Sequence, residues 1–105
     1  MPNLKQLHLA GTDVTDRALA DLSTLTGLEE LRLGFTNVGD DGVQHLGGLE
    51  HLNSLWLEKT AVTDTGLATL QRLVGLQELN IRVTDVSREA VAKFQVAVPD
   101  CDVLG

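Results

Sequence analysis

Hydrophobic residues recur along the chain with a period of 24 positions that is maintained without drift. The leading column of this pattern consists of four leucines, Leu4, Leu28, Leu52 and Leu76. Other columns keep the same spacing: Leu7, Leu31, Leu55 and Leu79; Leu9, Leu33, Leu57 and Ile81; Leu19, Val43, Leu67 and Val91; Leu22, Leu46, Leu70 and Phe94. Chance does not produce so many columns in register, so we expect four structural repeats.

The spacing of hydrophobic residues changes within each repeat, which predicts a strand followed by a helical segment. Leu7 and Leu9 alternate with polar or small residues, as in a short, half-buried strand. From Leu19 through Leu22 to Leu25 the spacing is three, as on one face of a helix. No single repeat can bury such a stripe alone, so neighbouring repeats must stack on each other.

Polar and small residues also form columns that predict how the turns and helices are held. A threonine follows each strand, and we expect its hydroxyl to bond to unpaired backbone where the chain leaves the sheet; the four are Thr12, Thr36, Thr60 and Thr84. A Ser or Thr precedes three of the helices and is expected to accept a hydrogen bond from an amide of the first turn: Thr15, Thr63 and Ser87. At the next position the helix dipole favours a carboxylate, and Asp16, Asp40 (after Gly39) and Asp64 stand there. A column of small residues predicts close approach of consecutive helices: Ala18, Gly42, Gly66 and Ala90.

The repeat unit L-x-x-L-x-L, followed by T-x-V-T-D-x-G-L as in Thr60–Leu67, resembles the leucine-rich repeat, more narrowly its bacterial form and the cysteine-containing class of F-box proteins. The resemblance covers Leu4 to Pro99, and Thr stands where that class has Cys. It implies an α/β fold, a right-handed solenoid with parallel strands on a concave face and short helices on a convex face. The expected single domain 1–105 contains repeats 4–27, 28–51, 52–75 and 76–99 and a terminal strand 100–105. Such solenoids mostly bind proteins.

The length and the net charge of the chain restrict the classes of partner that it can bind. A chain of 105 residues allows one domain, and 8 basic against 15 acidic residues give a net charge of −7. This balance counts against nucleic acid and anionic membranes, which need a basic footprint. The sequence contains neither a signal peptide nor an apolar stretch of membrane-spanning length, which favours a cytoplasmic location.

Candidate chemistry is sparse, so we expect no enzyme activity, cofactor or metal. The three histidines, His8, His45 and His51, show no ligand spacing. No histidine or lysine base recurs beside the threonine column, which argues against a nucleophile there. The single cysteine, Cys101, is expected to pack as a small hydrophobic residue, and Asp100 and Asp102 should raise the pKa of its thiol.

The strand residues that point away from the core are the candidate binding surface. The 24-residue register stacks His8, Arg32, Trp56 and Asn80 into one outward row, which places the only Trp of the chain on this face. Two interpretations of Trp56 stay open: a cross-strand contact covered by Arg32, or a binding anchor, since Trp and Arg dominate interface hot spots. The expected protein contacts are Arg32, Phe35, Trp56, Glu58, Asn80 and Arg82. Arg32, Lys59 and Arg82 balance Glu30, Glu58 and Glu78, so the face is nearly neutral.

The two ends of the repeat array differ, which gives an alternative function. The chain enters the first repeat at Met1-Pro2-Asn3-Leu4 with no polar cap, while Pro99 and two aspartates dilute the pattern at the other end. Leucines 7, 9, 19 and 22 are therefore expected to face solvent. The alternative to a protein-binding module is a structural, self-assembling fragment of a longer protein that forms a homodimer through its N-terminal repeat.

Overall fold

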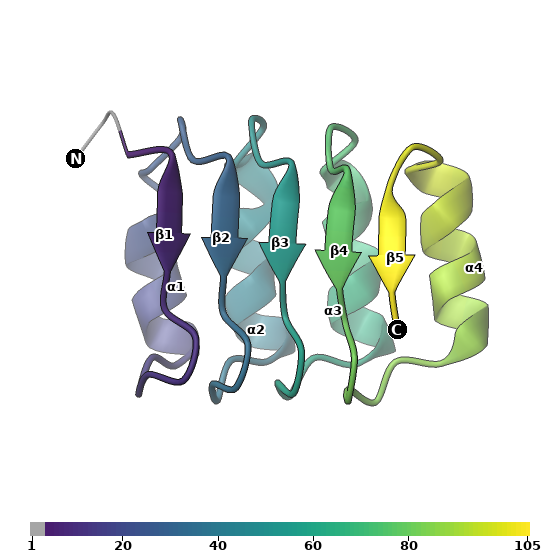
Figure 1. Cartoon of the computed structure of the whole chain (residues 1–105), viewed down its shortest axis with the longest axis horizontal. Coiled ribbons are helices and arrows are strands. Elements are labelled where there is room, and N and C mark those ends of the chain that lie inside the picture. Colours follow the sequence, from purple (N-terminus) through teal and green to yellow (C-terminus); the bar gives the residue numbers. More distant parts are fainter. Residues whose placement is uncertain (1–3) are drawn as a thin grey trace.

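The computed structural model describes residues 4–105 and shows one sheet covered on one side by helices (Figure 1). Residues 1–3, part of the expected uncapped entry, lie outside this description. Five three-residue strands run parallel in the order of the sequence: β1 (Gln6–His8), β2 (Glu30–Arg32), β3 (Ser54–Trp56), β4 (Glu78–Asn80) and β5 (Asp102–Leu104). The molecule measures 36 × 25 × 18 Å.

Short helices connect each strand to the next and form the second layer behind the sheet (Figure 1). The α-helices are α1 (Asp16–Leu22), α2 (Asp40–Val43), α3 (Asp64–Thr69) and α4 (Arg88–Ala97). Two 3-10 helices extend α2 and α3: η1 (Gln44–Gly48) and η2 (Leu70–Arg72). The α/β solenoid expected from the repeats is thereby confirmed. Within residues 4–105, no helix combines the length and apolar character needed to cross a membrane.

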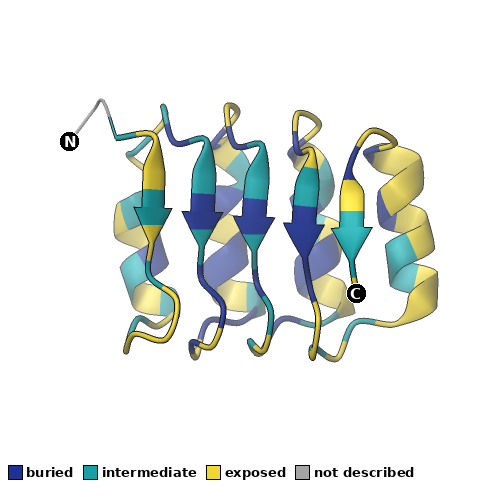
Figure 2. Cartoon of the chain, in the orientation of Figure 1, coloured by how far each residue is buried: buried dark blue, intermediate teal, exposed yellow. Residues whose placement is uncertain are grey.

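The leucine columns form one continuous core between the two layers. Leu31, Leu55 and Leu79 pair in register along the sheet and are fully buried, as the dark middle positions of their strands show (Figure 2). At about 1.5–3 kcal/mol for each fully buried aliphatic side chain, this stacking is the main stabilising term. A strand residue and its equivalent 24 positions on are therefore direct neighbours, as the period predicted.

The threonine column performs the structural role expected of it. Each hydroxyl donates a hydrogen bond of 2.6–2.7 Å to the carbonyl three residues earlier: Thr12 to Leu9, Thr36 to Leu33, Thr60 to Leu57 and Thr84 to Ile81. These carbonyls stand where the chain turns off the sheet towards the helices. The hydroxyls thus satisfy backbone acceptors at every turn.

The expected side-chain caps of α1 and α3 are wrong: neither Thr15 nor Thr63 accepts a hydrogen bond from its own helix, and at α3 an aspartate of the preceding repeat binds the Thr63 hydroxyl instead. Only Ser87 accepts a hydrogen bond from its own helix, from the Ala90 amide at 3.1 Å. The Thr63 hydroxyl instead donates to the Asp40 carboxylate, which also accepts from the amides of Thr63 (2.8 Å) and Gly66 (3.0 Å). We call the residues that make such contacts, Asp16, Asp40 and Asp64, the aspartate ladder.

The aspartate ladder joins consecutive repeats along the helical layer. Asp16 accepts from the Gly39 amide at 2.6 Å, and Asp64 accepts from the amide and hydroxyl of Ser87 at 2.6 and 2.7 Å. It also explains the small residues of the neighbouring column. A Cβ atom on Gly42 would lie 2.5 Å from Asp16 Oδ1, and one on Gly66 would lie 2.3 Å from Asp40 Oδ1.

The leucines of the N-terminal repeat are less buried than their equivalents in the other repeats, as expected, except for Leu19. Leu7, Leu9 and Leu22 are only partly buried. Leu19 was expected to face solvent, but it is fully buried. The reason is its position against α2, where its Cδ1 atom would lie 2.9 Å from a Cβ on Gly42.

Candidate protein-binding face

The face of the sheet opposite the helices carries the outward positions of all five strands. We call it the open sheet face; it corresponds to the concave face expected from the sequence. Its residues are Gln6, His8, Glu30, Arg32, Ser54, Trp56, Glu78, Asn80, Asp102 and Leu104. The strand register places His8 beside Arg32, Arg32 beside Trp56, and Trp56 beside Asn80, as expected, and extends the row to Leu104.

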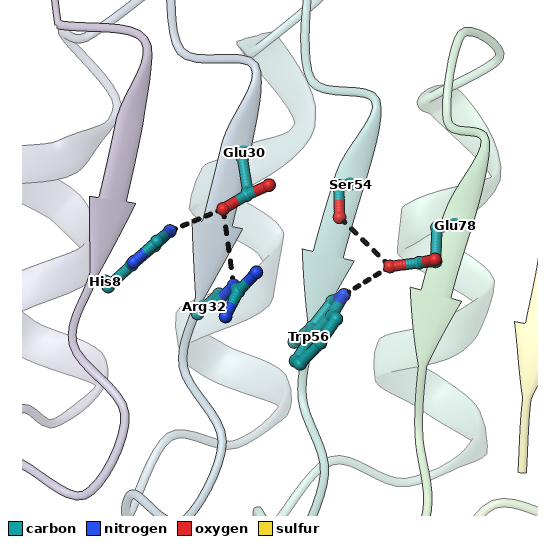
Figure 3. A network of polar contacts seen from close by, with 6 residues as sticks. All are labelled: His8, Glu30, Arg32, Ser54, Trp56 and Glu78. Carbon is teal, nitrogen blue, oxygen red and sulfur yellow. Dashed lines mark hydrogen bonds and ion pairs between the residues drawn. The ribbon is translucent and has the colours of Figure 1, made fainter.

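Charged side chains on β1 and β2 are paired with each other and with Trp56. The Glu30 carboxylate contacts His8 Nε2 and lies 3.3 Å from Arg32 Nε (Figure 3). The guanidinium of Arg32 stacks on the indole, with Cζ 4.2 Å from the ring centroid. The cross-strand interpretation of Trp56 therefore describes a contact that is present, and the anchor interpretation stays a prediction.

The indole nitrogen of Trp56 is also bonded within the chain. Its Nε1 donates to Glu78 Oε1 at 2.6 Å, and the Ser54 hydroxyl reaches the same oxygen at 3.4 Å (Figure 3). One ring face and the polar edge of Trp56 are thus held by neighbouring strands. A hydrogen bond to a charged acceptor is about twice as strong as a neutral one, so the indole has a fixed orientation.

Asn80 and Glu58 contact each other and are less accessible to a partner than we expected for protein-binding residues. Only 6% of Asn80 is exposed, and its Nδ2 donates to Glu58 Oε2 at 3.3 Å while its Oδ1 accepts from the Arg82 amide at 3.1 Å. Glu58 Oε1 is buried and would lie 1.8 Å from a Cβ on Gly34. Gly34 therefore leaves the space in which Glu58 lies, and Asn80 positions Glu58.

A second row of residues follows the strands and has left-handed backbone. We call it the exit row; it consists of Gly11, Phe35, Lys59 and Val83, with φ of 71°, 58°, 49° and 55°. Phe35 is 59% exposed and Val83 76% exposed. Lys59 Nζ lies 5.7 Å from the centroid of the Phe35 ring. The repeat pattern placed Phe35 in this column but did not predict the backbone geometry, for which Gly11 was the one signal.

A hollow of about 450 Å³ lies where the exit row meets the open sheet face. We call it the exit hollow; its lining is Phe35, Glu58, Lys59, Asn80, Arg82 and Val83. Four of the six predicted contact residues line it. The other two, Arg32 and Trp56, belong to the paired row on the strands and do not line it.

The candidate chemistry outside this face is structural. Cys101 is buried, and burial, with help from Asp102 and Glu78, raises the pKa of its thiol to about 11. The thiol is therefore almost fully protonated near neutral pH and is a poor nucleophile. Among residues 4–105, no three histidine, cysteine or acidic side chains come together in a way that would hold a metal ion.

Comparison with known proteins places the chain among repeat proteins. A family model described as Leucine Rich repeat matches residues 1–23 and 24–47. No curated protein matches the chain at a significant level. Solved structures do match: internalin C2 from Listeria monocytogenes is similar over 94% of this chain and 40% of that chain, with 25% identity and a TM-score of 0.76. The chain thus spans less than half of this internalin.

Two further structures share the fold at lower identity. The structure described as Leiomodin-1 Actin-Binding Site 2 is similar over 99% of this chain and 70% of that chain, with 16% identity and a TM-score of 0.73. A chain of the Chaetomium Mex67:Mtr2 subunits is similar over 97% of this chain and 78% of that chain, with 19% identity and a TM-score of 0.72. These two similarities concern the fold alone.

Proposed function

Because this chain is a leucine-rich repeat protein, we propose that it is a non-catalytic module that binds another protein through its open sheet face. Solenoids of stacked repeats present an extended concave surface that serves for binding, and the fold is in general an interaction scaffold. The observation that carries the proposal is the arrangement of Trp56: an outward indole, stacked by Arg32 and oriented by Glu78. A rigid aromatic anchor loses little entropy when a partner covers it.

A random peptide library displayed on phage tests this proposal, because the selection does not require the partner to be identified first. Binders selected on the intact chain are measured against the variant Trp56→Ala and against a matched control, Val96→Ala, at an 84%-exposed position of helix α4. We expect Trp56→Ala to weaken the binders at least about 30-fold, as for a hot-spot residue, and Val96→Ala to leave them unchanged. Circular dichroism checks that both variants fold. Equal binding of wild type and a folded Trp56→Ala would refute the proposal.

A second candidate function is association of two copies through the first repeat. It is favoured by a difference between equivalent positions: Leu7 and Leu9 are partly exposed, whereas Leu31 and Leu33 are fully buried under the preceding repeat. Covering those side chains with a second copy would remove apolar surface from water. A measurement of molecular mass against protein concentration separates this candidate from the first.

A further inference from the structure

Three side chains of the exit row are held on a backbone that suits glycine better. A left-handed conformation brings Cβ close to the following carbonyl, and a β-branched residue such as Val83 is rarely found there. Gly11 occupies the same column in the first repeat, and a Cβ there would meet nothing within 4 Å. The chain therefore tolerates backbone strain at Phe35, Lys59 and Val83 while these side chains stay exposed. Strain of this kind clusters at binding sites.

The exit hollow combines apolar walls with unpaired positive charge. Phe35 and Val83 supply exposed apolar surface, while Lys59 and Arg82 form no ion pair with any residue between 4 and 105. The hollow has one acidic residue, Glu58, whose Oε2 already accepts from Asn80 and whose Oε1 is buried. Two cations against this one carboxylate leave the hollow with a net positive charge, although the whole chain carries −7.

We propose that the exit hollow binds an acidic peptide segment of the partner, in which a large apolar residue is flanked by carboxylates. The apolar side chain lies between Phe35 and Val83, and the carboxylates pair with Lys59 and Arg82. This inference rests on the proposed protein-binding function and names the partner's chemistry at one part of the same surface. It adds a second contact to the one at Trp56, whose indole nitrogen and one ring face are engaged by Glu78 and Arg32 and whose residue does not line the hollow.

The exposed apolar walls favour a peptide over a nucleic acid as the occupant. Two cations could also pair with phosphates and a base could stack on Phe35, but the exposed Val83 has no ring on which a base could stack. Nucleic-acid binding also needs several neutralised phosphates, and the net charge of −7 opposes it. A peptide satisfies both features of the hollow with adjacent residues.

The test titrates the isotope-labelled full chain with the blocked tripeptide Ac-Asp-Leu-Asp-NH2 and follows its amide NMR signals. We expect the largest shifts at the exit row, together with weaker binding as salt rises, because both cations are solvent-exposed. Ac-Asn-Leu-Asn-NH2 removes the charges and Ac-Asp-Ser-Asp-NH2 removes the apolar side chain, and each should bind at least about threefold more weakly. Equal binding of either control peptide, or shifts confined to other surfaces, would overturn the proposal.

Variants on either side of the hollow separate charge, apolar contact and folding. Lys59→Gln with Arg82→Gln should weaken the tripeptide at least about threefold, whereas Lys93→Gln, an exposed lysine of helix α4, should not. Val83→Gly should weaken binding without loss of folding, because glycine relieves the backbone strain. Unchanged binding in the double variant overturns the proposal. If the tripeptide fails while library binders still depend on Trp56, this inference fails and the proposed function stands.

Discussion

The exit-row residue, three positions after the end of each of the first four strands, has a left-handed backbone where the chain leaves the sheet, and three of these four residues are not glycine. Phe35, Lys59 and Val83 share the left-handed backbone of Gly11. Such a backbone costs a residue with a side chain about 1–2 kcal/mol. Since the side chains are exposed, little burial offsets this cost at Val83, which is 76% exposed. A stability measurement on a variant of Val83 can therefore isolate the free-energy cost of the left-handed backbone.

We predict that Val83→Gly stabilises the fold. Relief of strain contributes about 1–2 kcal/mol, and the greater freedom of glycine in the unfolded chain removes about 0.5–1 kcal/mol of that gain. The net effect of about 0.5–1 kcal/mol should raise the melting temperature by a few degrees in a thermal scan. The matched control is Val74→Gly, at a 73%-exposed position without positive φ. This control substitution should lower the melting temperature. A lower melting temperature for Val83→Gly would contradict the strain argument.

At the scale of elements, the aspartate ladder couples the start of each helix to the repeat before it. Asp40 accepts hydrogen bonds from two amides and one hydroxyl of the next repeat. From the sequence, a Thr-Asp pair before a helix predicts a local cap, and that expectation is wrong for Thr15 and Thr63. For Thr63, local rules could not reveal the partner Asp40, because it lies 23 residues away and becomes a neighbour only when repeats stack.

We expect Asp40→Ala to destabilise the chain by roughly 2–4 kcal/mol, because it leaves two amides and a hydroxyl without their charged acceptor. Asp40→Asn should cost less, since one amide oxygen can still accept from both backbone groups. The adjacent Asp41→Ala is a matched control, because Asp41 is exposed and makes no hydrogen bond or ion pair within the described chain. Urea unfolding gives the change in the free energy of unfolding for each of the three variants. Equal losses for Asp40→Ala and Asp41→Ala would mean that the ladder contributes nothing.

The ladder should also make stability depend on pH through Asp64. Hydrogen bonds from the amide and then the hydroxyl of Ser87 lower the pKa of Asp64 below its ordinary value of 3.8. Because the folded-state pKa is depressed, this contribution is complete above about pH 3.8 and disappears as the pH falls through the folded value. The stability difference between wild type and Asp64→Asn, measured in urea from pH 7 downwards, should therefore shrink only in that acid range. A difference that stays constant down to pH 2 would contradict this assignment.

At the scale of the whole molecule, the fold could be predicted well from the sequence because every repeat has the same pattern of hydrophobic positions. The register that joins Leu31 to Leu55 and Arg32 to Trp56 follows directly from the 24-residue period. The open sheet face was less predictable. Its side chains bond across strands, so the burial of Asn80 and the pairing of Trp56 with Glu78 depend on distances that a period does not contain. The geometry of the exit row needed backbone angles, which only the structure supplies.

The N-terminal end of the repeat array leaves leucines of the core columns partly uncovered. Leu7, Leu9 and Leu22 are partly exposed because no earlier repeat in the described chain covers them. Leu19 is fully buried by α2 and contributes nothing to this surface. The surface that a second copy could cover is therefore smaller than the sequence indicated, so association through it should be weak and dependent on concentration.

We predict that light scattering detects a mass rising from one chain towards two as concentration increases, and that Leu9→Glu removes the rise. A carboxylate at that position would have to be desolvated in the dimer, and desolvation of an unpaired charge is strongly unfavourable. Leu9 also packs on the core, so circular dichroism must show that the variant folds. Leu104→Glu, at a partly buried position on the opposite edge strand, is the control and should leave the association unchanged. A mass that stays strictly monomeric at high concentration would eliminate the dimer and leave protein binding through the open sheet face as the function to pursue.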